Sequence, residues 1–81
     1  MKTVIKLFAK ARDLAGTPVI ELDLNESQTA DELRVALGEQ VPELRPLLPS
    51  LLIAVGNDYA LPTTLVGGRT DLAVFPPVSG G

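Results

Sequence analysis

Hydrophobic and polar residues alternate near the start of the chain, which is the pattern of β-strands. Residues 2–9 and 18–24 both combine this alternation with β-branched residues, so we predict two strands. The polar segment between them, Lys10–Ala15, has room for one or two helical turns and is closed by Gly16. The first quarter of the chain therefore predicts a hairpin with an enlarged loop.

A helical spacing of apolar residues follows, and its start is well marked. Thr29 and Glu32 have the spacing of a capping box. In this motif the Thr29 hydroxyl accepts a hydrogen bond from the Glu32 N–H, and the Glu32 carboxylate accepts one from the Thr29 N–H. The apolar residues that recur at helical spacing are Leu33, Ala36, Leu37 and Val41. Pro42 prevents continuation, so we predict one main covering helix at about residues 30–40.

The second half of the chain predicts further strands. Residues 42–50 contain three prolines and form a loop or a short 3₁₀ turn. Residues 51–55 are a continuous apolar run, which we interpret as a central strand buried on both faces. Residues 59–61 are able to pair at an edge, and residues 70–75 predict the last strand.

This order of elements predicts an α+β fold. Two strands, a crossover helix and further strands give a mixed sheet of four or five strands with one main covering helix. The length supports a single core, so we expect one domain over residues 1–75 and an extended C-terminal tail over residues 76–81.

Composition limits the chemistry that this chain can perform. It has no cysteine and no histidine, which excludes disulfides, thiol nucleophiles, imidazole bases and His/Cys zinc sites. We expect no metal and no cofactor bound by the chain. The net charge of −3 argues against nucleic acid, although four of the seven cations lie in the first twelve residues. No apolar stretch is long enough to span a membrane, so we expect a cytoplasmic protein without a membrane partner.

The last six residues carry the strongest functional signal. Pro76 and Pro77 lack N–H donors and hold the chain extended, and Gly80 and Gly81 remove side chains from the tip. Six extended residues reach about 20 Å. Such a tail suits insertion of a terminal carboxylate into a narrow cleft of another protein. A frayed end is the alternative interpretation, because termini are rich in small residues.

The whole chain resembles the small subunit of molybdopterin synthase, a ubiquitin-like β-grasp sulfur carrier. The most specific part is the ending AVFPPVSGG at 73–81. The stretch LFAKARDLAG at 7–16 resembles the first strand and loop of that family, and the helix opening TADELRVAL and the strand LLIAV match by type and position. The resemblance implies the ubiquitin-like β-grasp fold.

The resemblance also implies a mechanism that uses Gly81. A ubiquitin-activating-type enzyme adenylates its carboxylate with ATP, which binds to that enzyme. A cysteine desulfurase or rhodanese-type donor then supplies the sulfur of a thiocarboxylate. The carrier docks on the large subunit of the synthase, in a heterotetramer, and gives sulfur to cyclic pyranopterin monophosphate. The chain is then the sulfur-donating subunit of a sulfurtransferase and is not catalytic alone.

The remaining residues implied by the resemblance surround the tail. The residues expected to guide the tail or contact a partner are Gly80, Ser79, Val78, Pro77, Pro76, Phe75, Phe8 and Arg12. Core packing is an equal alternative for Phe75, and a solvated surface arginine for Arg12. Two other functions stay open: a sulfur carrier of another pathway, such as thiamine, tRNA thiolation, cysteine synthesis or the tungsten cofactor, or a ubiquitin-fold interaction module.

Overall fold

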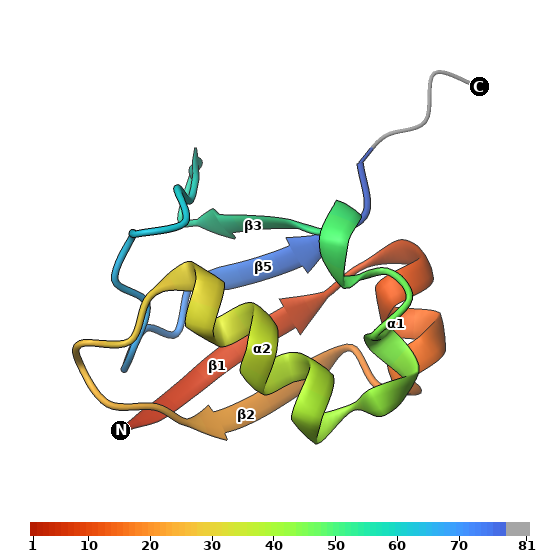
Figure 1. Ribbon diagram of the computed structural model, residues 1–81, viewed down its shortest axis with the longest axis horizontal. Coiled ribbons are helices and arrows are strands. Elements are labelled where there is room, and N and C mark those ends of the chain that lie inside the picture. The colour runs from red at the N-terminus through yellow and green to blue at the C-terminus, as the bar shows by residue number, and fades with distance from the viewer. Residues whose placement is uncertain (78–81) are drawn as a thin grey trace.

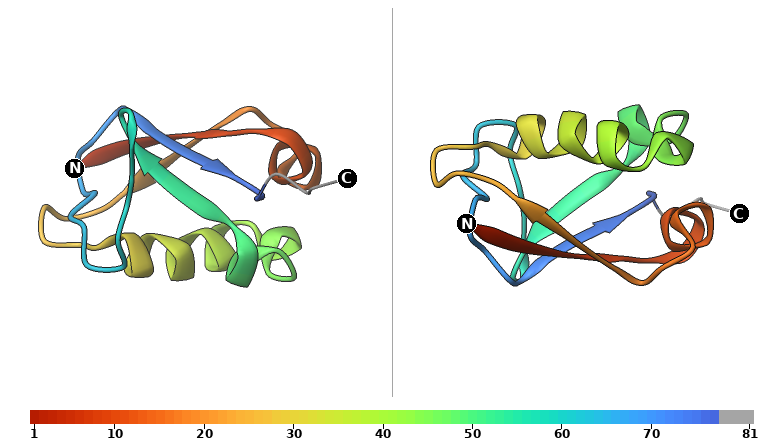
Figure 2. Two further views of the ribbon diagram at one scale, coloured as in Figure 1. Left: turned by 90° about the horizontal axis from the view of Figure 1, so that it is seen from above. Right: turned by 90° about the horizontal axis from the view of Figure 1, so that it is seen from below.

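The computed structural model describes residues 1–77 and consists of a five-stranded sheet with one long helix across one face (Figures 1 and 2). The elements in chain order are β1 (Lys2–Leu7), α1 (Ala9–Ala15), β2 (Val19–Asp23), α2 (Ala30–Gln40), η1 (Pro42–Leu44), η2 (Leu48–Ser50), β3 (Leu52–Val55), β4 (Asp58–Tyr59) and β5 (Leu72–Phe75). The α2 helix occupies the predicted residues, and the proline-rich segment after it forms two short 3₁₀ helices.

The strands lie side by side in the order β2-β1-β5-β3-β4. The β1 strand pairs antiparallel with β2 and parallel with β5, while β3 pairs antiparallel with both β5 and β4. The last strand in the sequence is therefore the central strand of the sheet. This mixed sheet with its covering helix confirms the predicted α+β, ubiquitin-like β-grasp fold.

The β3 strand corrects one prediction, because it is neither central nor buried on both faces. It lies fourth in the strand order, and within it only Ile53 is buried, at 4% exposure, while its other three residues are half-buried. Since α2 covers one face of the sheet alone, alternate residues such as Leu52 and Ala54 point to the uncovered side. The apolar run at 51–55 reflects this half-exposed setting and not burial on two sides.

The core fills the space between the sheet and α2. Its strand residues alternate along β1, where Thr3, Ile5 and Leu7 are buried, and α2 contributes Leu33 and Leu37. Each fully buried leucine or isoleucine side chain stabilises the fold by about 1.5–3 kcal/mol relative to exposure. The other core residues are Ala11, Ile20, Leu24, Ala30, Leu44, Leu51, Ile53, Val66, Leu72 and Val74.

Hydrogen bonds hold the start of α2 and join the helix to the segment that follows it. The predicted capping box is present, because the Thr29 hydroxyl accepts from the Glu32 N–H at 3.3 Å and the Glu32 carboxylate accepts from the Thr29 N–H at 3.0 Å. Farther along the helix, the Arg34 guanidinium donates to the carbonyl oxygens of Leu48 and Leu51, the second at 2.7 Å. This arginine therefore ties the proline-rich segment to the helix.

The chain leaves the sheet beside α1. The β1 strand ends at Leu7, and Ala9 turns the backbone into α1 with a φ of +54°, while Gly16 ends that helix with a φ of +76°. The C-terminal end of β5 lies next to α1 (Figure 2). Within residues 1–77, no helix has the length and apolar character that crossing a bilayer requires.

Candidate functional site

The face of the sheet opposite α2 is not covered by any element of residues 1–77 (Figure 2). The strand registers place one set of side chains on it, and none of these residues is buried. We call this set the open face: Val19 and Glu21 of β2, Val4 and Lys6 of β1, Ala73 and Phe75 of β5, Leu52 and Ala54 of β3, and Tyr59 of β4.

All three aromatic side chains of the chain lie on this face or at its end. Phe8 follows β1 with an extended backbone, and its N–H donates to the Val74 carbonyl at 3.1 Å, so the β1–β5 pairing continues beside Phe75. Phe8 is 45% exposed and Tyr59 is 70% exposed. Aromatic residues carry much of the energy of protein interfaces, so their position outside the core indicates a docking surface.

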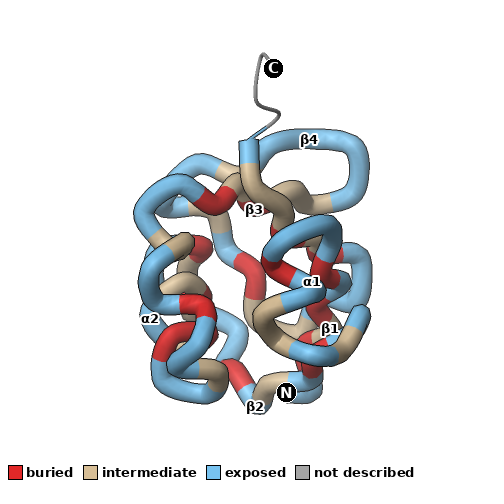
Figure 3. The backbone as a smooth tube through the Cα atoms, turned by 90° about the vertical axis from the view of Figure 1, so that its right-hand side faces the viewer, coloured by how far each residue is buried: buried red, intermediate tan, exposed pale blue. Residues whose placement is uncertain are grey.

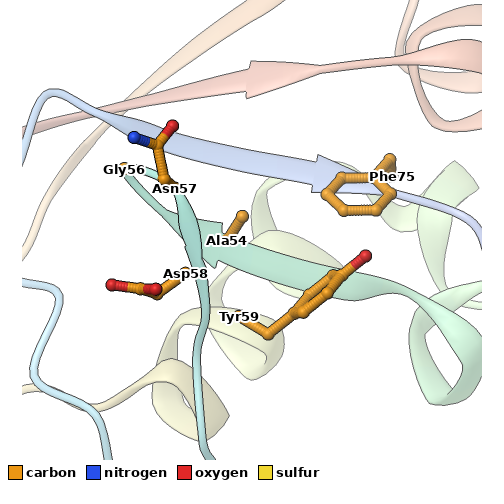
Figure 4. Close-up of a pocket in the computed structure, with 6 residues that line it drawn as sticks. All are labelled: Ala54, Gly56, Asn57, Asp58, Tyr59 and Phe75. Carbon is orange, nitrogen blue, oxygen red and sulfur yellow. The ribbon is translucent and has the colours of Figure 1, made fainter.

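Tyr59 and Phe75 form a ring pair at one end of the open face. Their centroids are 6.1 Å apart with an angle of 47° between the planes. Figure 4 shows the two rings beside Ala54, with the Asp58 carboxylate directed away from them. The hollow at this place has a volume of about 200 Å³ and is lined by Ala54, Gly56, Asn57, Asp58, Tyr59 and Phe75. It is large enough to receive an apolar side chain of a partner.

The prolines direct the chain away from the end of β5. Phe75 is the last paired residue, opposite Leu52, and Pro76 and Pro77 have no N–H with which to extend the ladder. Pro76 is half-buried and Pro77 is exposed. In Figure 3 the described part of the chain ends at the top of the view. We call Phe75 with Pro76 and Pro77 the tail root.

The structure brings together four of the predicted site residues: Phe8, Phe75, Pro76 and Pro77. Phe75 is half-buried on the face opposite the core, which disfavours the core alternative. Arg12 lies on α1 with its side chain 52% exposed, and its Nε is 4.0 Å from the carboxylate of the neighbouring Asp13. The roles of these residues stay predictions, and Val78, Ser79, Gly80 and Gly81 lie outside the described residues.

Tyr59 is the residue that sequence reasoning missed. It was predicted only as part of an edge strand, and its place beside Phe75 depends on the turn at Gly56 that brings Tyr59 opposite Ala54. Gly56 has a φ of +61°, which glycine adopts without strain. The available signal was the scarcity of aromatics, since Tyr59 is the single tyrosine and the chain has no tryptophan.

Charged groups with shifted pKa values lie at the other end of the sheet. The Arg69 guanidinium donates to both carboxylate oxygens of Asp71, at 2.8 and 2.7 Å, and these hydrogen bonds lower the pKa of Asp71. A hydrogen bond from the Met1 ammonium lowers the pKa of Asp23 in the same way. A second hollow of about 260 Å³ also lies there, lined by Lys2, Glu21, Leu22 and Asp23. None of these groups adjoins the tail root, so they offer it no acid or base.

Comparison with known proteins agrees with this geometry. Residues 5–81 match the ThiS family. The molybdopterin synthase sulfur carrier subunit of Arabidopsis thaliana is 31% identical over 77 residues, which are 95% of this chain and 80% of the relative. The protein of the same name from Drosophila yakuba is 34% identical over 80 residues, which are 95% of this chain and 88% of the relative.

Solved structures give the same fold. SAMP1 from Haloferax volcanii superposes with a TM-score of 0.84 at 25% identity, over 100% of both chains. The putative molybdopterin converting factor subunit 1 from Pyrococcus furiosus superposes with a TM-score of 0.83 at 24% identity, over 96% of this chain and 99% of that one. The fold and the open face thus define a ubiquitin-like domain of the carrier type. The chain belongs to the ThiS family, and its resemblance to molybdopterin synthase sulfur carrier subunits is confirmed.

Proposed function

We propose that this chain is the sulfur carrier subunit of a molybdopterin synthase and that Gly81 carries the sulfur. The observation that carries the proposal is the similarity to curated sulfur carrier subunits of that enzyme, at 31% and 34% identity over 95% of the chain. The aromatic open face, which ends at the tail root, supports it because a carrier must dock while it presents its tail.

The proposed chemistry uses the carboxylate of Gly81 and catalytic groups of partner proteins. The carboxylate attacks the α-phosphate of ATP on a ubiquitin-activating-type enzyme, and pyrophosphate leaves. The outer sulfur of a cysteine persulfide on a desulfurase or rhodanese-type donor then attacks the acyl carbon, AMP leaves, and an acyl disulfide forms. A thiol of a partner protein or a small thiol reduces this disulfide, which releases the thiocarboxylate and leaves a new disulfide on the donor side. Adenylation is needed because a free carboxylate is a poor electrophile, whereas AMP is a good leaving group. ATP is held by the activating enzyme.

The transfer step takes place on the large subunit. The carrier docks with Phe8, Tyr59 and Phe75 against an apolar surface, and the tail enters the active site, where the sulfur passes to cyclic pyranopterin monophosphate. Residues 76–81 span about 20 Å when extended, enough to reach a buried site. Pro76 and Pro77 lower the entropy that is lost when the tail is fixed, because proline φ angles are already restricted. Residues 1–75 serve as the docking domain.

Intact-mass analysis tests this proposal directly. The chain is produced with and without its activating enzyme, and an oxygen-to-sulfur exchange mapped to Gly81 is expected only with the enzyme. Deletion of Gly81, or addition of one residue after it, should abolish molybdopterin formation while the melting temperature stays unchanged. A chain without Gly81 that still supports molybdopterin synthesis would show that the domain acts as an interaction module.

The pathway is tested separately from the carrier chemistry. We expect the chain to rescue a strain that lacks the molybdopterin synthase small subunit, and not a strain that lacks the thiamine sulfur carrier. Rescue of the thiamine strain alone would mean that the chain still carries sulfur as a thiocarboxylate but serves thiamine synthesis instead of molybdopterin synthesis.

A further inference from the structure

Three of the seven positive charges of this acidic chain, those of Lys6, Lys10 and Arg12, lie toward the tail-root end of the sheet. Residues 1–12 hold four of the seven cations and none of the ten acidic residues. In the structure, Lys6 stands on the open face, and Lys10 lies on α1, the helix beside the end of β5. Both lysines are exposed. Lys6 and Lys10 therefore give this end of the sheet two exposed positive charges, although the net charge of the chain is −3.

Lys2 and Lys6 lie on the same strand, β1, but of these two only Lys2 has an acidic partner among residues 1–77. Lys2, at the far end of β1, pairs with Asp23 in the sheet register, and its ammonium lies 3.3 Å from the Glu21 carboxylate. Lys6, on the same face, lies between Val19 and Ala73 in that register. Opposite charges on directly neighbouring strands stabilise a sheet, and Lys6 has no such neighbour in its register. Among residues 1–77, neither Lys6 nor Lys10 makes a salt bridge.

We propose that Lys6 and Lys10 form a cationic rim of the docking face and that the large subunit presents an acidic rim opposite to them. This inference rests on the proposed function and specifies the partner surface. The aromatic centre supplies affinity, whereas the rim steers the encounter and fixes its orientation. At physiological salt, charges that lie more than about 8–10 Å from the partner are largely screened. The rim lies nearest to the approaching partner, so it acts more strongly on the encounter than the net charge of the chain does.

The test measures association of the full chain with its large subunit at low and at physiological salt. We expect the double variant Lys6→Gln/Lys10→Gln to associate about fivefold more slowly at low salt, with a nearly unchanged dissociation rate, because exposed rim charges act mainly on the association rate. Its association should also depend less on salt than that of the natural chain.

The matched control is Lys2→Gln/Arg69→Gln, which changes the net charge by the same amount at the far end of the sheet. Both positions are exposed, and both are paired with acidic residues of the chain itself. We expect its association rate to stay within about twofold of the natural chain.

Two results overturn the inference while the proposed function stands. One is association of the Lys6/Lys10 variant at the rate of the natural chain, and the other is an equal loss in the control variant, which would assign the effect to net charge. If the natural chain does not bind the large subunit at all, the proposed function itself fails. Melting temperatures that lie well above the assay temperature for both variants show that the comparison is between folded proteins.

Discussion

The two faces of the sheet are built from the same strands but from different kinds of residue. The covered face holds aliphatic side chains such as Ile5, Leu72 and Val74, all fully buried. The open face and its end hold Phe8, Tyr59 and Phe75, which are half-buried or exposed. Aliphatic residues pack a permanent core, whereas aromatic residues provide large rigid contact areas that bind a partner with little loss of side-chain entropy. If the open face docks as proposed, this division separates folding from docking within one small domain.

The largest expected effect comes from the covered face. Leu72 lies on the central strand with no exposed surface, so Leu72→Ala leaves a cavity and should lower the free energy of unfolding by about 2–5 kcal/mol. Urea unfolding followed by circular dichroism measures this loss. Because small domains are stable by about 5–15 kcal/mol, the variant should be close to its unfolding threshold.

The matched control for this change is Leu52→Ala on the open face. Leu52 is half-buried and lies opposite Phe75, so its truncation should cost clearly less stability than that of Leu72. Equal losses of unfolding free energy for the two leucines would mean that the open face is covered in the isolated chain. The two faces would then not differ in burial, contrary to the comparison above.

The next effect concerns the aromatic centre of the open face. Tyr59→Ala removes a side chain that is 70% exposed, so we expect little change in the urea midpoint. If the open face docks as proposed, the binding free energy for the large subunit should weaken by about 1–3 kcal/mol, which is about a five- to 150-fold loss of affinity, as for a typical interface hot spot. Isothermal titration calorimetry measures the difference.

Val35→Ala is the control for Tyr59. Val35 is 61% exposed on α2, on the other side of the molecule, and its truncation should change neither stability nor affinity much. A loss of affinity in the Val35 variant that equals the loss in the Tyr59 variant would move the docking surface from the open face to the helix.

The sequence predicted the parts of this fold that local interactions decide. The α2 helix was predicted at its observed residues because Thr29 and Glu32 mark its start and Pro42 its end. The position of β3 was wrong because the strand that becomes central depends on pairing between distant segments. A short apolar run looks the same on a half-covered sheet as in a fully buried strand.

The same distinction holds for the candidate site. Phe8 and Phe75 were expected near the tail from the family resemblance, and each also lies at or near the end of a predicted strand. Tyr59 was missed because its contact with Phe75 follows from the β3–β4 register, which the turn at Gly56 sets. A register of this kind is a property of the folded sheet and has no local sequence signal beyond the turn.

The smallest effect concerns the charges at the end of the sheet away from the tail root. Hydrogen bonds from Arg69 lower the pKa of Asp71 below its ordinary value of 3.8, so the pair stabilises the fold above the pKa of the unfolded chain. This stabilisation is lost as the pH falls from about 4 through the lower pKa of the folded state. Both side chains are nearly half exposed, so the contribution is small.

Arg69→Gln should therefore lower the melting temperature slightly at neutral pH, and the difference from the natural chain should shrink as the pH falls below about 4 and Asp71 becomes protonated in both proteins. Thermal melts across this range measure it. Arg12→Gln removes the same charge from a contact of 4.0 Å and should give a smaller difference at neutral pH. A difference for Arg69→Gln that persists undiminished at pH 2 would show that Arg69 stabilises the fold through contacts other than its pair with Asp71. The two ends of the sheet would then differ in packing and not in the balance of their charges.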